Sequence, residues 1–151
     1  MATATKIRLV IAEDHPVMRY TLRSALEHYA DIEIVGEASN GEDAFLTAEK
    51  LQPNIVLMDV NMPKLDGIAA TRRIKTTSSR IAVIGLSIDG EGSSVGEMLR
   101  AGAGAVIAKE RIIEDLYDAI KRASASPQAE SPRGPHSYLP SHPVMSPSCE
   151  Q

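Results

Sequence analysis

The sequence contains few of the residues that stabilise small secreted proteins or bind nucleic acid without specificity. It has one cysteine, Cys149, among 151 residues, so neither an internal disulfide nor a cysteine-based metal site can form. Phe45 and four tyrosines are the only aromatic residues, so the core must be aliphatic. The formal net charge of -4 argues against a non-specific nucleic-acid-binding protein, because such proteins carry a basic face.

Long apolar segments are also missing from the sequence. No apolar run approaches the roughly 18 residues that a membrane span needs. The N-terminal stretch MATATKIRLVIAED lacks the basic region, apolar core and cleavage site of a secretion signal. We therefore expect a cytoplasmic protein that does not bind the membrane.

The composition changes sharply near residue 124. From there to residue 151 the chain has six prolines and seven serines, and its apolar residues are scattered singly. Such a segment buries too little apolar surface to offset the entropy that is lost on ordering. We therefore predict one folded domain over residues 5–123 and a Pro/Ser-rich disordered tail over residues 124–151.

Strand-like and helix-like patterns alternate within the predicted domain. Short apolar runs rich in Ile and Val lie at 7–12, 32–38, 55–58, 81–86 and 105–108, which is typical of parallel strands that are buried on both faces. Segments with helical periodicity follow them at 16–30, at 41–51, around 68–75, before Gly102 and at 112–120. This alternation predicts an α/β fold, a flavodoxin-like, doubly wound five-stranded parallel sheet of order 2-1-3-4-5 with five helices.

Four of the expected strands end in polar side chains. The first is followed by Glu13 and Asp14, the third by Asp59, the fourth by Ser87 and the fifth by Lys109. Ligands of open parallel sheets bind at the carboxyl ends of the strands, at the switch point in strand order. Each of these residues alone would more commonly be a loop or capping residue, but together they predict a site at this edge of the sheet.

Three carboxylates at one edge repel each other strongly. At a separation of about 4 Å and an effective dielectric constant near 20, each pair costs about 4 kcal/mol. Either some of their pKa values rise or a divalent cation lies among them, and oxygen ligands favour Mg²⁺, or Mn²⁺ as an alternative. Ser87 and Lys109 suit anionic oxygens instead, as a hydroxyl donor and a point charge. This combination predicts a phosphoryl acceptor with Asp59 as the nucleophile.

Five stretches resemble the receiver domain of bacterial two-component response regulators. They are VIAEDHPVMRYTLRSAL, VGEASNGEDAF, PNIVLMDVNMPKLDGIAATRRI, VIGLS and AGAGAVIAKE. Their order and spacing carry the resemblance, which covers about residues 5–123. The DVNMPKLDG segment is specific by itself, whereas an acid pair after a strand is a weak signal.

The resemblance implies a role for each residue of the predicted site. Asp59 would be phosphorylated by a histidine kinase or a phosphotransfer protein, and Ser87 and Lys109 would hold the phosphoryl oxygens. Mg²⁺ would be bound by the carboxylates of Asp14 and Asp59 and the carbonyl of Asn61, with Glu13 acting through water. Such a protein is not an enzyme with a separate substrate, although it assists its own phosphotransfer and autodephosphorylation.

The sequence departs from the family pattern in three places. Val106 stands where many members have Tyr or Phe as a switch, and Glu110 follows the lysine where Pro is frequent. Many relatives also continue into a DNA-binding domain, whereas this sequence ends in the Pro/Ser-rich tail. We therefore expect a stand-alone receiver that does not bind DNA directly.

Several functions fit this sequence. The leading hypothesis is a phosphorylation-controlled switch that binds an unknown output protein through its fourth helix, fifth strand and fifth helix. The alternatives are a passive phosphate shuttle or sink, and a truncated receiver of a DNA-binding transcription regulator. A haloacid-dehalogenase-type phosphatase would need an acid two residues after the nucleophile, where this chain has Asn61, so we reject that function.

Two further expectations concern the surroundings of the site. Asp89 lies two residues after Ser87, where it would tune the attack of water on the phosphoryl group. Glycines at 90, 92 and 96 predict a short fourth helix that starts late, and the output signal is expected as an ordering change around residues 89–98. His15 is expected to be a first-turn residue at the rim of the site.

Overall fold

The computed structural model describes residues 5–88 and 93–125. Five parallel strands form one sheet in the order β2-β1-β3-β4-β5. The strands are β1 (Ile7–Ala12), β2 (Ile32–Ala38), β3 (Ile55–Asp59), β4 (Ala82–Ser87) and β5 (Ala105–Ala108). The predicted fold class is confirmed, and the expected strands agree with the observed ones to within one residue at each end.

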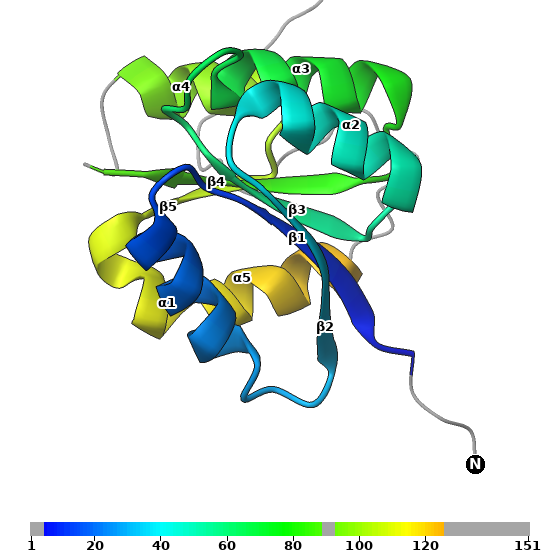
Figure 1. Ribbon diagram of the computed structural model, residues 1–151, viewed down its shortest axis with the longest axis vertical. Helices are drawn as coiled ribbons and strands as arrows, with labels where there is room; N and C mark the ends of the chain where they lie inside the picture. The colour runs from blue at the N-terminus through cyan, green and yellow to red at the C-terminus, as the bar shows by residue number, and fades with distance from the viewer. Residues whose placement is uncertain (1–4, 89–92, 126–151) are drawn as a thin grey trace, which may run out of the picture.

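Helices cover both faces of the sheet, as Figure 1 shows. α1 (Pro16–Leu26) and α5 (Ile112–Ala125) lie on one face, and α2 (Gly41–Leu51), α3 (Gly67–Thr77) and α4 (Ser93–Ala101) lie on the other. A short 3-10 helix, η1 (Lys109–Arg111), joins β5 to α5. None of the helices in the described ranges has both the length and the apolar character to cross a bilayer.

The sheet separates two hydrophobic core clusters. Strand β1 contributes to both, because alternate side chains point to opposite faces. Leu9 and Ile11 pack in the cluster beneath α1 and α5, whereas Val10 and Ala12 pack in the cluster beneath α2, α3 and α4. Burial on both faces explains why the strands read as continuous apolar runs.

Local sequence signals fix where the helices begin. Pro16 is in the first turn of α1, where its fixed φ is compatible with a helix and its missing N–H costs nothing. The side chain of Asn40 accepts a hydrogen bond from Asp43 N at 2.8 Å at the start of α2, and Asp66 caps α3 through Ala69 N at 2.9 Å. These are ordinary N-caps, and each one satisfies a backbone N–H of the first turn of its helix.

Two helix ends differ from the sequence-based expectation. α1 ends at Leu26 and does not continue to residue 30, because Tyr29 leaves the helix and stacks on Tyr117 with ring centroids 3.8 Å apart. α5 continues to Ala125, so Ser124 and Ala125 are helical although the expected tail begins at residue 124. The Ser124 hydroxyl donates to the Lys121 carbonyl at 3.0 Å in this last turn. The expectation of a disordered segment otherwise falls on residues 126–151, outside the described ranges.

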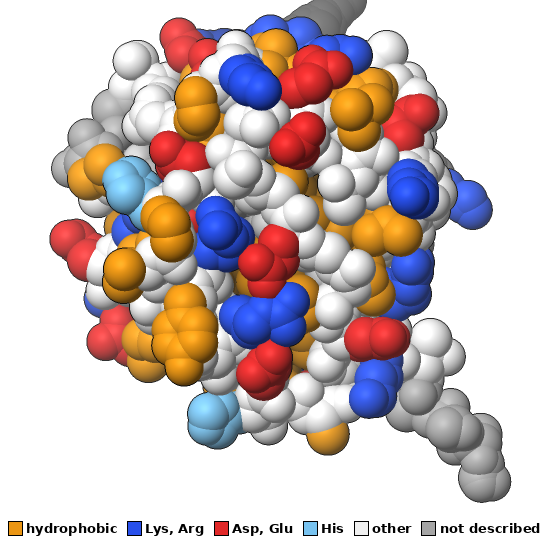
Figure 2. Space-filling view, viewed as in Figure 1, with side chains coloured by type: hydrophobic (Ala, Val, Ile, Leu, Met, Phe, Trp, Pro, Cys, Tyr) orange, Lys and Arg blue, Asp and Glu red, His pale blue; other side chains and the backbone are white. Residues whose placement is uncertain are grey.

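The surface carries charges of both signs. On the face seen in Figure 2, acidic and basic side chains are interspersed, and hydrophobic side chains form small separate groups. One chain of opposite charges links α1 to β2, where Arg23 pairs with both Glu27 and Glu37. The network extends to the predicted site through Arg19, which also pairs with Glu37.

Candidate functional site

The structure brings the strand ends together at the carboxyl edge of the sheet. Glu13 and Asp14 directly follow β1, Asp59 ends β3, Ser87 ends β4 and Lys109 directly follows β5. Because β3 lies between β1 and β4, Asp59 is at the centre of this edge. The register pairs Asp59 with Leu86, which places Ser87 one residue beyond the level of Asp59 on the neighbouring strand.

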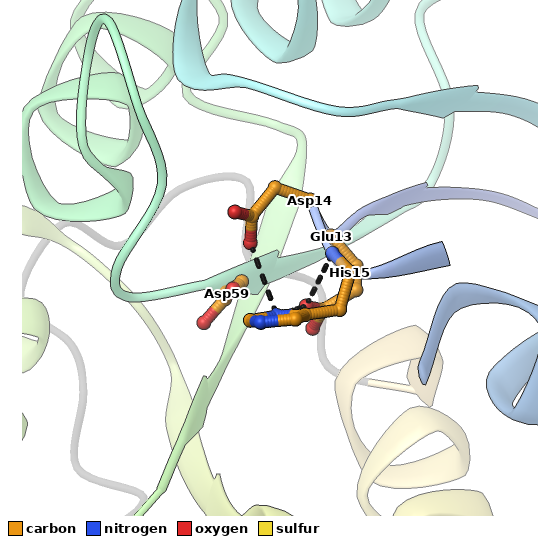
Figure 3. A group of neighbouring side chains, drawn as sticks. All are labelled: Glu13, Asp14, His15 and Asp59. Atoms are coloured by element: carbon orange, nitrogen blue, oxygen red, sulfur yellow. Dashed lines mark hydrogen bonds and ion pairs between the residues drawn. The ribbon is translucent and has the colours of Figure 1, made fainter. Parts of the chain in front are cut away.

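Three carboxylates and one imidazole form a compact cluster (Figure 3). One potential ligand atom from each of Glu13, Asp14, His15 and Asp59 lies within 4.8 Å of the others. The side chains of Glu13 and Asp59 are almost completely buried, with 0% and 3% exposed, whereas that of Asp14 is 28% exposed. The cluster therefore has a buried base and a mouth that is open to solvent.

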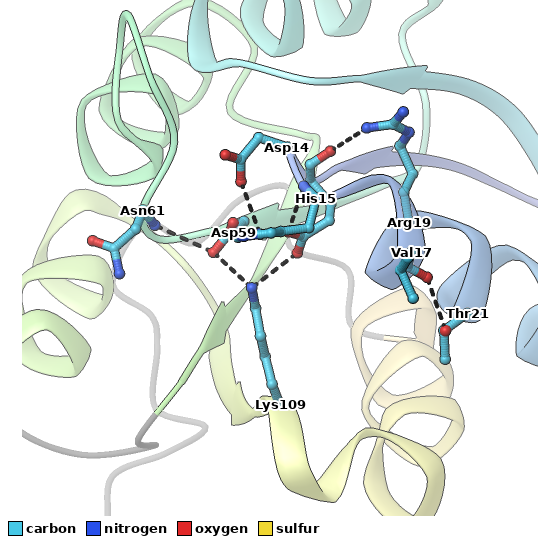
Figure 4. A network of polar contacts seen from close by, with 9 residues as sticks. Asp14, His15, Val17, Arg19, Thr21, Asp59, Asn61 and Lys109 are labelled. Atoms are coloured by element: carbon cyan, nitrogen blue, oxygen red, sulfur yellow. Dashed lines mark hydrogen bonds and ion pairs between the residues drawn. The ribbon is translucent and has the colours of Figure 1, made fainter.

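Lys109 supplies the positive charge at the base of the cluster. Its Nζ atom lies 3.0 Å from Glu13 Oε1 and 3.2 Å from Asp59 Oδ1, and its side chain is only 13% exposed (Figure 4). Burial lowers the pKa of Lys109, but its contacts with Glu13 and Asp59 outweigh this effect and raise the pKa above the usual value. Lys109 is therefore a permanent cation at neutral pH.

Asp59 is the most perturbed acid of the site. Burial raises its pKa to about 7, and the negative charge of Glu13 adds to the increase. The ion pair with Lys109 and a hydrogen bond from Asn61 N, 3.2 Å from Asp59 Oδ1, act in the opposite direction. The sequence predicted repulsion among these carboxylates, and this repulsion adds to the effect of burial in raising the pKa of Asp59.

Two buried carboxylate oxygens accept no hydrogen bond of suitable geometry within the described ranges. Glu13 Oε1 makes an ion pair with Lys109 Nζ at 3.0 Å, and Asp14 Oδ1 lies 3.5 Å from His15 Nδ1. Buried oxygens without well-directed donors are costly, and a divalent cation with oxygen ligands would complete their coordination. The donor set therefore fits Mg²⁺ or Mn²⁺.

Most residues of the predicted site lie together at this edge of the sheet, and His15 lies among them as well. His15 lies at the rim, as expected, with a 71% exposed side chain, but its Nδ1 is 3.3 Å from Glu13 Oε2 and 3.5 Å from Asp14 Oδ1. Its place directly after two acids was the available signal, and spacing alone could not give its ring orientation. Ser87 is buried, and Asp89 is outside the described ranges.

The loop after Asp59 depends on a glycine. A Cβ atom on Gly67 would lie 2.0 Å from the carbonyl oxygen of Asp59, and Gly67 N donates to Val60 O at 2.9 Å. Only glycine allows the start of α3 to approach β3 this closely. The loop can therefore close directly over the end of the strand that carries Asp59.

Comparisons with known proteins identify relatives of this chain. The family model described as the response regulator receiver domain matches residues 9–121. The chain is 32% identical to the transcriptional regulatory protein DegU of Brevibacillus brevis over 134 residues, and 35% identical to the response regulator protein VraR of Staphylococcus aureus over 118 residues. These matches cover 89% and 78% of this chain but only 57% and 56% of the two relatives.

A solved structure shows the same architecture. The crystal structure of the response regulator domain of Thermotoga maritima CheB superposes with a TM-score of 0.76 at 28% identity. The match covers 80% of this chain and 98% of that one. The relatives by sequence are longer than the matched region, and this chain spans a little over half of their length.

Proposed function

Because this chain belongs to the response regulator receiver family, we propose that it is a signalling switch that is controlled by phosphorylation of Asp59. One observation carries the proposal: Asp59 is a buried carboxylate at the carboxyl edge of the sheet, and the cation Lys109 pairs with both it and the neighbouring acid Glu13. A nucleophile of this kind can take a phosphoryl group from a phosphohistidine of a histidine kinase or a phosphotransfer protein.

Receiver domains bind Mg²⁺ at an acidic pocket. In this chain we assign the ion to the carboxylates of Asp14 and Asp59 and the carbonyl of Asn61, with Glu13 acting through water, and Mn²⁺ is an alternative. When it is bound, the ion neutralises the clustered carboxylates and the charge that develops on a transferred phosphoryl group. The buried oxygens of Glu13 and Asp14, which accept no hydrogen bond of suitable geometry within the described ranges, support this assignment.

The chain's own residues then perform the transfer. An ionised oxygen of Asp59 forms a bond to phosphorus while the bond from phosphorus to the donor's imidazole nitrogen breaks, and the freed imidazole keeps that electron pair. Lys109 Nζ, 3.2 Å from Asp59 Oδ1, is close enough to pair with a phosphoryl oxygen on that carboxylate. The Ser87 hydroxyl, at the end of the adjacent strand, donates to another oxygen.

Transfer from a small phosphodonor tests the acceptor. With Mg²⁺ and acetyl phosphate, intact-mass spectrometry should show one added phosphoryl group, and Asp59→Asn should remove it. Asp66→Asn is the matched control, because it makes the same chemical change at an exposed N-cap that asparagine also satisfies. Labelling of Asp59→Asn at the wild-type level would overturn the assignment, and labelling without Mg²⁺ would overturn the role of the metal.

We assign the binding of an unknown output protein to the face formed by α4, β5 and α5. Val106 is only partly buried on β5, and it offers no aromatic ring that could change rotamer on phosphorylation. We therefore assign the switch to an ordering change around residues 89–98, of which 89–92 lie outside the described ranges. Hydrogen exchange with and without beryllofluoride and Mg²⁺ tests it. Increased protection of residues 93–98 supports a switch, whereas no response supports a passive phosphate shuttle.

The similarity to a transcriptional regulatory protein favours a second candidate function. In this alternative the chain is the receiver part of a DNA-binding transcription regulator, and phosphorylation of Asp59 controls that DNA-binding part. An immunoblot of the native protein distinguishes the two. A native protein of the size of these 151 residues supports the stand-alone switch, and a substantially larger one supports the transcription regulator.

A further inference from the structure

The loop between β1 and α1 determines the shape of the acidic cluster. Its three successive residues, Glu13, Asp14 and His15, supply three of the four clustered side chains. Glu13 is buried, whereas Asp14 and His15 are not, so the positions of Asp14 and His15 depend on the backbone of this loop more than on packing. A group that fixes the backbone here would fix the donor atoms of the whole cluster.

Arg19 makes such a contact. Its Nη1 atom donates a hydrogen bond to the backbone carbonyl of Glu13 at 2.7 Å, as Figure 4 shows. Arg19 N also donates to His15 O at 2.9 Å as part of α1. The residue therefore contacts the loop at both Glu13 and His15, on either side of Asp14.

Arg19 is itself held by a chain of charges. Its Nε atom lies 3.3 Å from Glu37 Oε1 on the edge strand β2, and Arg23 Nε donates to the other oxygen of the same carboxylate. Arg23 also pairs with Glu27 at 3.0 Å. With Glu37 on one side and the Glu13 carbonyl on the other, the planar guanidinium has little freedom to turn.

We propose that Arg19 is a positioning residue for the divalent-cation site: it holds the Glu13–His15 loop so that the carboxylates converge before any ion binds. This inference rests on the proposed function, because that function supplies the ion. Arg19 reaches the loop through a backbone carbonyl, so it shapes the site without being a ligand. Groups that orient metal ligands in this way change metal affinity by about 10- to 100-fold when they are removed.

Binding of Mn²⁺ to the purified 151-residue chain, followed by electron paramagnetic resonance of the free ion, tests this inference. Arg19→Met keeps a long apolar side chain and removes the charge and the donors. We expect its dissociation constant to rise about tenfold. Arg19→Lys restores a charged donor and should recover most of the affinity. The phosphorylation rate at saturating Mg²⁺ should change much less than the Mg²⁺ concentration for half-maximal rate.

Arg8→Met is the matched control. Arg8 also donates from its guanidinium to a backbone carbonyl, that of Gln52 at 2.8 Å, but it lies near the opposite end of β1. An equal loss of Mn²⁺ affinity in Arg8→Met, or affinity of Arg19→Met within about twofold of wild type, would overturn the inference. A failure of Arg19→Lys to bind more tightly than Arg19→Met would do so as well.

A measurement without metal separates this inference from the proposed function. In the ion-free protein, the backbone amide resonances of Asp14 and His15 should shift or broaden in Arg19→Met and stay unchanged in Arg8→Met. If the wild-type chain binds no Mn²⁺, the metal part of the proposed function fails, and the amide spectra still decide whether Arg19 fixes the loop. Unchanged Asp14 and His15 resonances in Arg19→Met would refute it.

Discussion

At the scale of single residues, the burial of Asp59 makes the stability of the metal-free protein depend on pH. Burial and the charge of Glu13 raise the pKa of Asp59 from an ordinary value of 3.8 to about 7. The folded state therefore holds this proton more tightly than the unfolded chain does. The stability that results is fully present below about pH 4 and is lost as the pH rises towards 7.

This linkage predicts that Asp59→Asn stabilises the metal-free protein at high pH. Asparagine has a similar shape and no charge, so it imitates the protonated acid. Thermal melts in EDTA should show a higher melting temperature for Asp59→Asn than for wild type at pH 8, equivalent to about 1–2 kcal/mol. The difference should be much smaller at pH 5, where Asp59 carries its proton in the folded state, and should disappear below about pH 4.

The exposed acid Asp66 again provides the comparison. Asp66→Asn should melt like the wild type at both pH values, because its side chain caps α3 in either form. A stabilisation by Asp59→Asn that is the same at pH 5 and pH 8 would contradict the linkage. It would then reflect packing or hydrogen bonding and not charge.

At the scale of elements, the turn from β3 to α3 leaves no room for a side chain at Gly67. A Cβ atom at this position would lie 2.0 Å from Asp59 O, so the loop or the strand end must move. Gly67→Ala should lower the free energy of unfolding by about 2 kcal/mol and slow phosphorylation, because the displaced atoms belong to the acceptor. Denaturant unfolding and acetyl phosphate labelling measure the two effects.

Gly104 offers the same substitution without the clash. A Cβ atom there would have only Val83 O within reach, at 4.0 Å. Gly104→Ala should therefore change the free energy of unfolding by no more than about 0.5 kcal/mol and leave labelling intact. If the two substitutions lowered the free energy of unfolding equally, the close approach of Gly67 to Asp59 O would not be the cause of the loss.

The strands could be predicted from the sequence because their signal is local. Each is a short run of branched apolar residues that ends in a polar side chain, so both its position and its functional end are visible, as in IVLMD for β3. The places of Asp59, Lys109 and two acids at one edge of the sheet followed from these ends and from one topological rule. The predicted fold is therefore confirmed where sequence periodicity and strand order were enough, and the roles of these residues stay predictions.

Other features depend on contacts between distant segments. The end of α1 could not be predicted, because Tyr29 continues the apolar stripe of the helix but packs against Tyr117 of α5. The contact of Arg19 with the loop could not be predicted, because its partner is a backbone carbonyl, which carries no residue-specific signal. The sequence places His15 beside the acids, but the orientation of its ring, which brings it into the cluster, depends on the folded loop.

At the scale of the whole molecule, the folded unit should not need residues 126–151. Their composition gives little apolar surface to bury, and α5 ends at Ala125. A chain that stops after Ala125 should keep its melting temperature within about 2 °C and accept a phosphoryl group on Asp59 as before. A drop of more than about 5 °C would show that the segment packs on the domain.

The ion pair of Lys109 with Glu13 joins residues from opposite ends of the folded unit. During synthesis from the N-terminus, Asp59 leaves the ribosome well before the strand that brings Lys109. A nascent chain thus has its nucleophile without the cation that pairs with it, and the sheet between them is still incomplete. A chain can therefore accept a phosphoryl group through the proposed site only after β5 has been synthesised and has joined the sheet.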